Sequence, residues 1–264
     1  MSIKMKNQMK AIIKKDLRGI TSNHRMFVTL LVVPLVLTIF VPTIFLLAIR
    51  FAPAEASDLQ SLLEMLPREP GGDLSKDLAG LLLNYMLPAF FLLIPIMASS
   101  VTAASSFVGE KEKQTLETLL YSPLSLRQIF RSKVLASFLL GMSICLASFA
   151  AMLLVLETEA FLLLGSLILP DIKWALILLL VSPSVSMIAI TLIVRVSAKA
   201  QSVEDAQQSA VFLILPILFM LAGQFTGVFL ISSLLLLALG TFCAVLAFIL
   251  LKKCMGNFRY ENLL

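Results

Sequence analysis

The stretch Val228–Leu251, VFLISSLLLLALGTFCAVLAFILL, runs for 24 residues without a charged side chain. A helix needs about 20 apolar residues to cross the roughly 30 Å of hydrocarbon in a bilayer. The segment must be helical because lipid offers no partners to backbone polar groups. The whole chain has this character: 59% of its 264 residues are hydrophobic, 14% are charged and the mean hydropathy is +0.98. These values argue against a soluble domain and predict an integral membrane protein.

Similar apolar runs recur along the chain and predict one all-α membrane domain with six transmembrane helices. The fifth run is short, and only the turn-like sequence Gly223-Gln224-Phe225-Thr226-Gly227 separates it from the sixth. We expect the six spans at Phe27–Ile49, Tyr85–Val108, Val134–Leu156, Trp174–Val194, Ser209–Ala222 and Val228–Leu251.

Basic residues are distributed unevenly between the two sides of these spans. Of the 21 Lys and Arg residues, 17 lie in four segments that alternate with the opposite loops, and those loops hold nine of the 16 acidic residues. Because Lys and Arg near span ends are retained in the cytoplasm, we expect a multi-pass protein of the cell membrane with both termini cytoplasmic. A basic face toward anionic lipid accounts for the pI near 9.2 without nucleic acid. The basic segments are Met1–Met26, Gly109–Lys133, Arg195–Gln208 and Lys252–Leu264.

We divide the chain into residues 1–26, a cytoplasmic amphipathic helix that enters the first span, and residues 27–264, the domain that contains the six transmembrane helices. The helix is expected to lie in the membrane interface, with its apolar stripe at the acyl boundary and its basic residues among head groups; a solvated basic tail is the alternative. A signal peptide fits less well, because the basic region and the apolar run are both too long. The stripe comprises Met5, Met9, Ile12, Ile13, Leu17 and Ile20, and the basic side Lys4, Lys10, Lys14, Lys15 and Arg18.

Two extracytoplasmic segments are harder to interpret. Residues 50–84 contain three prolines and two adjacent glycines, and we expect one or two short helices that cover the outer mouth. Residues 160–169 are apolar but too few to cross the bilayer. They either dip into the outer leaflet and return, or prolong the third helix outward.

Single residues of other kinds point to structural roles. Trp174 beside Lys173 is typical of an aromatic anchor at the outer interface. Cys145 and Cys243 lie inside predicted spans and Cys254 on the cytoplasmic side, so no loop carries a pair suited to a disulfide.

The predicted spans contain no Asp, Glu, Lys, Arg or His. Proton relays, ion-coupled carriers and intramembrane metalloproteases need such groups within the bilayer. The chain also lacks the G-x-x-x-x-G-K-[ST] pattern that cradles ATP phosphates. Any energy source for transport must therefore lie on another molecule. Six prolines in the spans predict helix kinks: Pro34, Pro42, Pro88, Pro95, Pro183 and Pro216.

The loop between the second and third spans, residues 109–133, reads as a helix, a break and a second helix. Leu116, Leu119 and Leu120 give the first helix a small apolar face among acidic residues. Pro123 disfavours helical geometry before it, and Ser125 with Gln128 forms a capping box that starts the next helix. By spacing alone, this segment is either a docking element or an ordinary connection.

The residues of this loop resemble those of a known family of membrane proteins. Gly109-Glu-Lys-Glu-Lys113, Thr115–Leu120, Ser122-Pro-Leu-Ser125 and Lys133 are similar to the loop of type-2 ATP-binding-cassette (ABC) transporter permeases, most of all the bacterial sodium-export and multidrug-type permeases. The resemblance implies a membrane subunit that pairs with a second copy or a paralogue and with two separate cytoplasmic ATPase subunits. ATP and magnesium would then be bound by those partners, and this chain would hold no cofactor and no catalytic residue.

In that family the loop helix is a coupling helix seated in a groove of the ATPase. The resemblance implies that Glu110 through Leu120 form it here, with Thr115, Leu116, Leu119 and Leu120 packing in the groove. Glu110, Glu112 and Glu117 would meet basic partners. The substrate would pass between the two permeases or along their seam.

The leading functional hypothesis is the permease of an ATP-driven exporter. The alternatives are a non-transporting membrane protein, such as an assembly or immunity factor or a membrane-embedded enzyme, and a secondary carrier, which the uncharged spans disfavour. Sodium, a drug, a lipid and a peptide remain open as substrates, and an uncharged path favours an apolar or amphipathic cargo. The hydroxyls of Ser99, Ser100, Thr102, Ser105 and Ser106 either line a path or let helices pack closely, and their spacing favours packing.

Overall fold

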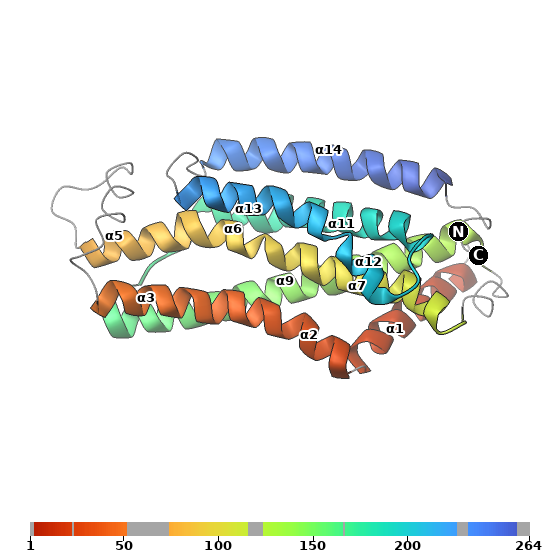
Figure 1. Ribbon diagram of the computed structural model, residues 1–264, viewed down its shortest axis with the longest axis horizontal. Coiled ribbons are helices and arrows are strands. Elements are labelled where there is room, and N and C mark those ends of the chain that lie inside the picture. Colours follow the sequence, from red (N-terminus) through yellow and green to blue (C-terminus); the bar gives the residue numbers. More distant parts are fainter. Residues whose placement is uncertain are drawn as a thin grey trace.

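The computed structural model describes residues 3–22, 24–51, 74–115, 124–165, 167–225 and 232–257, and within these ranges it contains helices and no strands. The helices form an elongated bundle whose members run along its long axis (Figure 1). Six of its helical runs are long and apolar enough to cross a membrane, which confirms the six-span, all-α prediction. They are Leu30–Ala48, Ser75–Glu112, Leu126–Leu164, Ile172–Ser197, Val203–Gly223 and Ser233–Gly256.

The runs are built from α-helices and three π-helical turns, named η1 to η3. In chain order they are α1 (Ile3–Ser22), α2 (His24–Leu35), η1 (Val36–Phe40), α3 (Val41–Phe51), α5 (Leu74–Leu81), η2 (Leu82–Met86), α6 (Leu87–Phe91), α7 (Leu93–Glu112), α9 (Leu126–Leu164), α10 (Ile172–Leu176), η3 (Ile177–Val181), α11 (Ser182–Ser197), α12 (Val203–Gln208), α13 (Val211–Phe225) and α14 (Ser233–Asn257).

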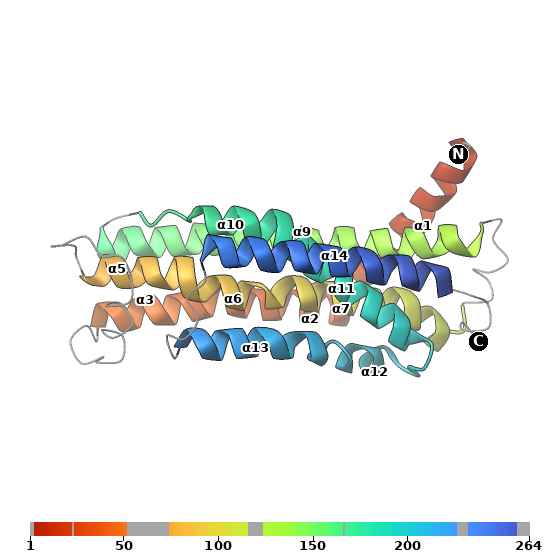
Figure 2. The same cartoon turned by 90° about the horizontal axis from the view of Figure 1, so that it is seen from above.

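The bundle has two distinct ends. We call one the α1 end: it carries α1, the end of α7, the start of α9, and α12 (Figure 1). The other, the α10 end, carries the end of α3, the start of α5, the end of α9, and α10. Figure 2 shows α1 leaving the bundle at an angle to the spans.

The second and fourth spans form the centre of the bundle. Helix α7 packs against α9 and α11, and α11 also packs against α14. The first, fifth and sixth spans leave most of their apolar side chains on the outside, among them Phe212, Phe219, Phe242 and Phe248. In a bilayer these side chains face hydrocarbon, so their exposure carries no hydrophobic penalty.

Small residues bring the central helices close together. A Cβ atom added at Gly141 of α9 would lie 2.4 Å from the Ser99 Oγ of α7 and 3.3 Å from the Ser99 Cα. Thr102 Oγ1 donates to the carbonyls of Ala98 and Ser99 on its own helix. These contacts fit the packing interpretation of the serine-rich sequence at Ser99 and Thr102.

Each π-helical turn ends two residues before a proline, at Pro42, Pro88 and Pro183. The amide of the residue just before each proline donates five residues back, as Leu87 N–H does to the Leu82 carbonyl. A proline has no N–H, so the next carbonyl in this pattern has no donor on its own helix. The structure thus places a π turn, a feature at which helices commonly kink, before three of the six prolines.

Two expectations for the outer segments can be compared with the structure. Helix α9 continues to Leu164 and ends at Gly165, whose φ of 66° is left-handed. Residues 160–164 therefore prolong the third helix, and the alternative that they dip into the leaflet is wrong. Of residues 50–84, the stretch 52–73 lies outside the described residues.

The prediction of an interfacial anchor at Trp174 is wrong. The indole is 2% exposed and lies between Phe91, at 5.3 Å between ring centroids, and Phe149, at 5.2 Å. Its Nε1–H donates to the Leu83 carbonyl at 3.2 Å. The π turn η2 leaves the Leu83 carbonyl without a donor on its own helix, and the indole donates to it. The sequence pattern did not predict this partner.

Candidate functional site

The candidate site lies at the α1 end, where α7 ends and α9 begins. Helix α7 ends at Glu112, and in the turn that follows Gln114 has a φ of 55°. Thr115 N–H donates to the Glu110 carbonyl at 2.9 Å. Helix α9 begins at a capping box in which Ser125 N–H donates to Gln128 Oε1 at 3.0 Å. The capping-box prediction is confirmed, and the two described edges of the loop are fixed by local hydrogen bonds.

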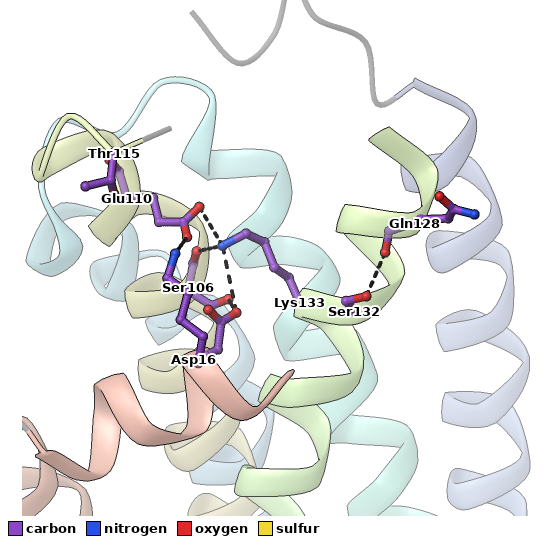
Figure 3. Close-up of polar contacts among 8 residues, drawn as sticks. Asp16, Ser106, Glu110, Thr115, Gln128, Ser132 and Lys133 are labelled. Carbon is purple, nitrogen blue, oxygen red and sulfur yellow. Dashed lines mark hydrogen bonds and ion pairs between the residues drawn. The ribbon is translucent and has the colours of Figure 1, made fainter. Parts of the chain in front are cut away.

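A buried lysine joins these two edges. Lys133 of α9 is 3% exposed, and its Nζ lies 2.9 Å from Glu110 Oε2 of α7 (Figure 3). The same ammonium group donates to the Ser106 carbonyl and lies 5.5 Å above the Phe107 ring. All these partners belong to α7, so one charged group fastens the base of α9 to the last turns of α7.

Helix α1 enters the same cluster through Asp16. Its Oδ2 accepts a 2.7 Å hydrogen bond from Ser106 Oγ and lies 3.8 Å from Lys133 Nζ. On the preceding residue, Lys15 Nζ donates to Glu110 Oε1 at 2.7 Å. We call Lys15, Asp16, Ser106, Glu110 and Lys133 the ion cluster. It joins α1, α7 and α9, which come from three separate parts of the chain.

The ion cluster is electrically balanced, with two carboxylates and two ammonium groups. Burial raises the pKa of the Asp16 carboxyl, and the positive charge of Lys133 only partly opposes that effect. Buried charges are tolerated in a protein when they are paired with opposite charges, as the two carboxylates are here with Lys133. Lys15 differs from the other residues of the ion cluster because 58% of its side chain is exposed. The two carboxylates thus depend mainly on Lys133.

Helix α1 reaches this position through its apolar face. Ile12 packs in a small buried group with Leu124 and Ile129, and Ile20 joins the main core. Part of the stripe that the sequence assigned to the acyl boundary therefore faces the protein's own helices. Exposed basic residues such as Lys10, Lys14 and Arg18 lie away from this contact.

A second set of contacts ties the end of α7 to α12. Glu112 Oε2 accepts from Val203 N–H at 3.3 Å, at the first residue of α12. Lys111 Nζ donates to the Ala198 carbonyl at 3.4 Å, just after α11. The same last turn of α7 thus contacts the connection that follows the fourth span.

The structure places three of the predicted coupling residues, and their roles in coupling stay predictions. Glu110 is buried in the ion cluster, Glu112 meets α12, and Thr115 is exposed, with its Oγ1 donating to the Glu110 carbonyl at 3.4 Å. The other four, Leu116, Glu117, Leu119 and Leu120, lie outside the described residues.

Sequence reasoning missed Asp16 and Lys133 as members of one cluster. A signal existed for Asp16, the only acidic residue in the first 26: it lies four residues after Ile12 and four before Ile20, on the apolar side of α1. A carboxylate in an apolar stripe indicates a buried polar partner. Nothing in the local sequence identified that partner as Lys133.

This geometry favours a mechanical role. Among the residues that the structure describes, no group of His, Cys, Asp or Glu is arranged to hold a metal ion. The hydroxyl of the ion cluster, that of Ser106, donates to the Asp16 carboxylate, and the two lysines pair with the carboxylates. These contacts hold α1, α7 and α9 together beside the loop that joins α7 to α9.

The fold defines a multi-pass membrane protein whose second and third spans meet in the ion cluster at one end. A family model, that of the ABC-2 family transporter protein, matches residues 10–235. The chain therefore belongs to the ABC-2 transporter family and is its membrane-spanning permease component, a transport subunit without catalytic activity of its own. Comparison with curated proteins and with solved structures gave no match.

Proposed function

We propose that this chain is the permease of an ATP-driven exporter, with its α1 end in the cytoplasm and residues 109–133 docked on a separate ATPase subunit. The observation that carries this proposal is the ion cluster, because it fastens both edges of that loop to each other and to α1. A loop anchored in this way transfers a displacement to the spans, whereas a flexible connection would absorb it.

In the proposed mechanism, ATP-driven closure of two ATPase subunits displaces the loop. Because Lys133 joins Glu110 to α9 and approaches Asp16 of α1, these three helices respond together. The second and third spans begin or end at this cluster and carry the displacement into the membrane. Leu116, Leu119 and Leu120 provide the apolar contact with the ATPase, and Glu117 meets a basic residue there.

A second copy of the chain or a paralogue completes the transporter. The outward apolar side chains of α13 and α14 are available to lipid or to that partner. An apolar or amphipathic substrate fits the predicted spans best, because they contain no ionisable side chain with which to replace the hydration shell of an ion. Of the two specificities that the resemblance implies, multidrug export fits this uncharged path better than sodium export.

Purification in mild detergent tests it. Co-expressed with its nucleotide-binding partner, the tagged chain should retain that subunit in equal amount, and the complex should hydrolyse ATP. Leu116→Asp and Glu117→Lys should release the ATPase, because each places an unfavourable charge in the docking contact. Lys199→Glu, an exposed charge change at the same end outside the loop, is the matched control.

Two results would overturn the proposal. One is retention of the ATPase and full transport by both loop variants. The other is transport at full rate by the purified chain in vesicles that contain no ATPase subunit.

A further inference from the structure

The π turn η2 of the second span contacts the start of the fourth span through three consecutive residues. The Leu83 carbonyl accepts from Trp174 Nε1–H at 3.2 Å, and Asn84 Oδ1 accepts from Asp171 N–H at 2.9 Å. The Tyr85 ring lies 3.4 Å below Lys173 Nζ. Three different kinds of contact thus meet within one helical turn at the α10 end.

The Leu83 contact depends on Pro88. Within η2 the Leu87 N–H donates to the Leu82 carbonyl, and Pro88 has no N–H to donate to Leu83. If this turn were α-helical, the Leu87 N–H would occupy the Leu83 carbonyl. In the π-helical register the Leu83 carbonyl therefore has no donor on its own helix, and the hydrogen bond from Trp174 competes with none.

The fourth span carries its own π turn next to the contact. Turn η3 follows α10 directly and ends two residues before Pro183. Converting a π turn to an α turn rotates the helix beyond it by about 100°, the angle of one residue. The proline supplies no N–H in either register, so it loses no hydrogen bond in the conversion. Both sides of the contact therefore lie where a helix changes register most readily.

Further side-chain contacts position the connection that precedes α10. Ile168 N–H donates to Glu157 Oε2 of α9 at 3.2 Å, and Asp171 caps α10 by accepting from Ile172 N–H at 2.6 Å. Lys173 Nζ also lies 3.5 Å from Asp171 Oδ2. The start of the fourth span is thus positioned by side-chain contacts, which break and re-form without unfolding a helix.

We propose that a clasp closes the α10 end between the second and fourth spans and opens in each transport cycle. The clasp consists of Leu83, Asn84 and Tyr85 on the second span and Asp171, Lys173 and Trp174 at the start of the fourth. The clasp rests on the proposed export function, because its opening matters only in a protein that moves a substrate. Trp174 is its positioning residue, since the indole holds η2 in the π-helical register.

A crosslink across the clasp tests whether it must open. In a background with Cys145, Cys243 and Cys254 replaced by alanine, Asn84→Cys and Asp171→Cys are joined by a short bifunctional methanethiosulfonate. ATP hydrolysis is then measured in the reconstituted complex with its ATPase subunits. We expect linking to abolish turnover and a reductant to restore it.

The matched control is a linked pair at the same end that does not cross the clasp. Thr43 of α3 donates to Glu159 of α9 at 2.6 Å, so Thr43→Cys with Glu159→Cys takes the same reagent. This link should leave turnover unchanged. Equal inhibition by both links would overturn the clasp, as would full turnover by the linked Asn84–Asp171 pair or failure of that pair to react.

The variant Trp174→Phe tests the register without a crosslink. It keeps an aromatic ring between Phe91 and Phe149 but removes the donor to the Leu83 carbonyl. We expect the yield of the Asn84–Asp171 link to fall and ATP hydrolysis without substrate to rise, each by up to about ten-fold, the range of one lost hydrogen bond. An unchanged yield would overturn the role of the indole.

These tests separate the clasp from the proposed function. If the wild-type chain retains no ATPase subunit, the export proposal fails at that step. If the complex forms and hydrolyses ATP while the linked clasp turns over normally, only the clasp fails.

Discussion

The two ends of the bundle are held by different forces. At the α1 end, Lys133 lies between Glu110 and Asp16, so full charges hold α1, α7 and α9 together. At the α10 end, an indole N–H, an amide oxygen and an aromatic ring hold the second span to the fourth. Removing one member of a buried ion pair costs far more than removing a neutral hydrogen bond. This difference indicates an α1 end that moves as a unit and an α10 end that opens.

The largest expected effect is that of Lys133→Met. It leaves the Asp16 and Glu110 carboxylates in a buried site without their main cation and should lower the free energy of unfolding by about 3–5 kcal/mol. Thermal unfolding of the detergent-purified protein measures the change. Lys199→Met removes an exposed lysine at the same end and should leave stability nearly unchanged. Equal stability of the two variants would remove the contrast between the ends.

A second prediction concerns pH. Because burial raises the Asp16 pKa above its ordinary 3.8, the folded state binds a proton more tightly than the unfolded state. Stability contributed by that proton is present at low pH and is lost as pH rises from 3.8 through the raised pKa, with a slope of at most about 1.4 kcal/mol per pH unit. Asp16→Asn should flatten this slope in unfolding measured across pH. An identical slope in the variant would contradict the prediction.

The indole hydrogen bond of the α10 end should respond less than the buried ion pairs of the α1 end. Trp174→Phe removes the donor to the Leu83 carbonyl while keeping most of the ring packing, and we expect a loss of about 1 kcal/mol in the free energy of unfolding. The same thermal assay applies. Phe161→Leu, at an exposed position of α9 near this end, serves as the control. A loss as large as that of Lys133→Met would show that the α10 end is no weaker.

The stack of Lys173 on Tyr85 should be weaker still. Tyr85→Leu removes the aromatic face below the ammonium group and should cost about 0.5–1 kcal/mol, whereas Tyr85→Phe keeps that face and should cost less. Comparing the two variants separates the cation–π contact from the tyrosine hydroxyl. If they are equally destabilised, the contact contributes nothing measurable.

The smallest effect is expected at Lys15. Its side chain is 58% exposed, so its ion pair with Glu110 is screened by water, and Lys15→Met should change stability by less than about 1 kcal/mol. Added salt should reduce even that difference. A change comparable to that of Lys133→Met would mean that the outer ion pair, and not the buried one, holds the end together.

Local features of the sequence predicted much of the fold. Apolar length gave six spans, and Ser125 with Gln128 gave the start of α9, because both signals depend only on neighbouring residues and on the solvent. The family of the loop was likewise recognisable from residues 109–133. The loop's roles in docking, including those of Glu110 and Glu112, stay predictions.

The remaining features required contacts between distant segments. Trp174 resembled an interfacial anchor because its neighbours in the sequence are those of a span end, but its partners Leu83, Phe91 and Phe149 belong to the second and third spans. The sequence did not decide the structure of residues 160–164. An apolar segment of that length has the same composition whether it dips into the outer leaflet or prolongs the third helix.

The sequence by itself determined which segments enter the membrane, since the free energy of placing a residue in lipid depends on that residue and its near neighbours. Only the tertiary structure decided that Asp16, Glu110 and Lys133 meet at one end and that Leu83 meets Trp174 at the other. Two of these pairings join residues 91 positions apart, in Leu83–Trp174, and 117 positions apart, in Asp16–Lys133. A buried charge or carbonyl is satisfied by whichever partner the packing of helices places beside it.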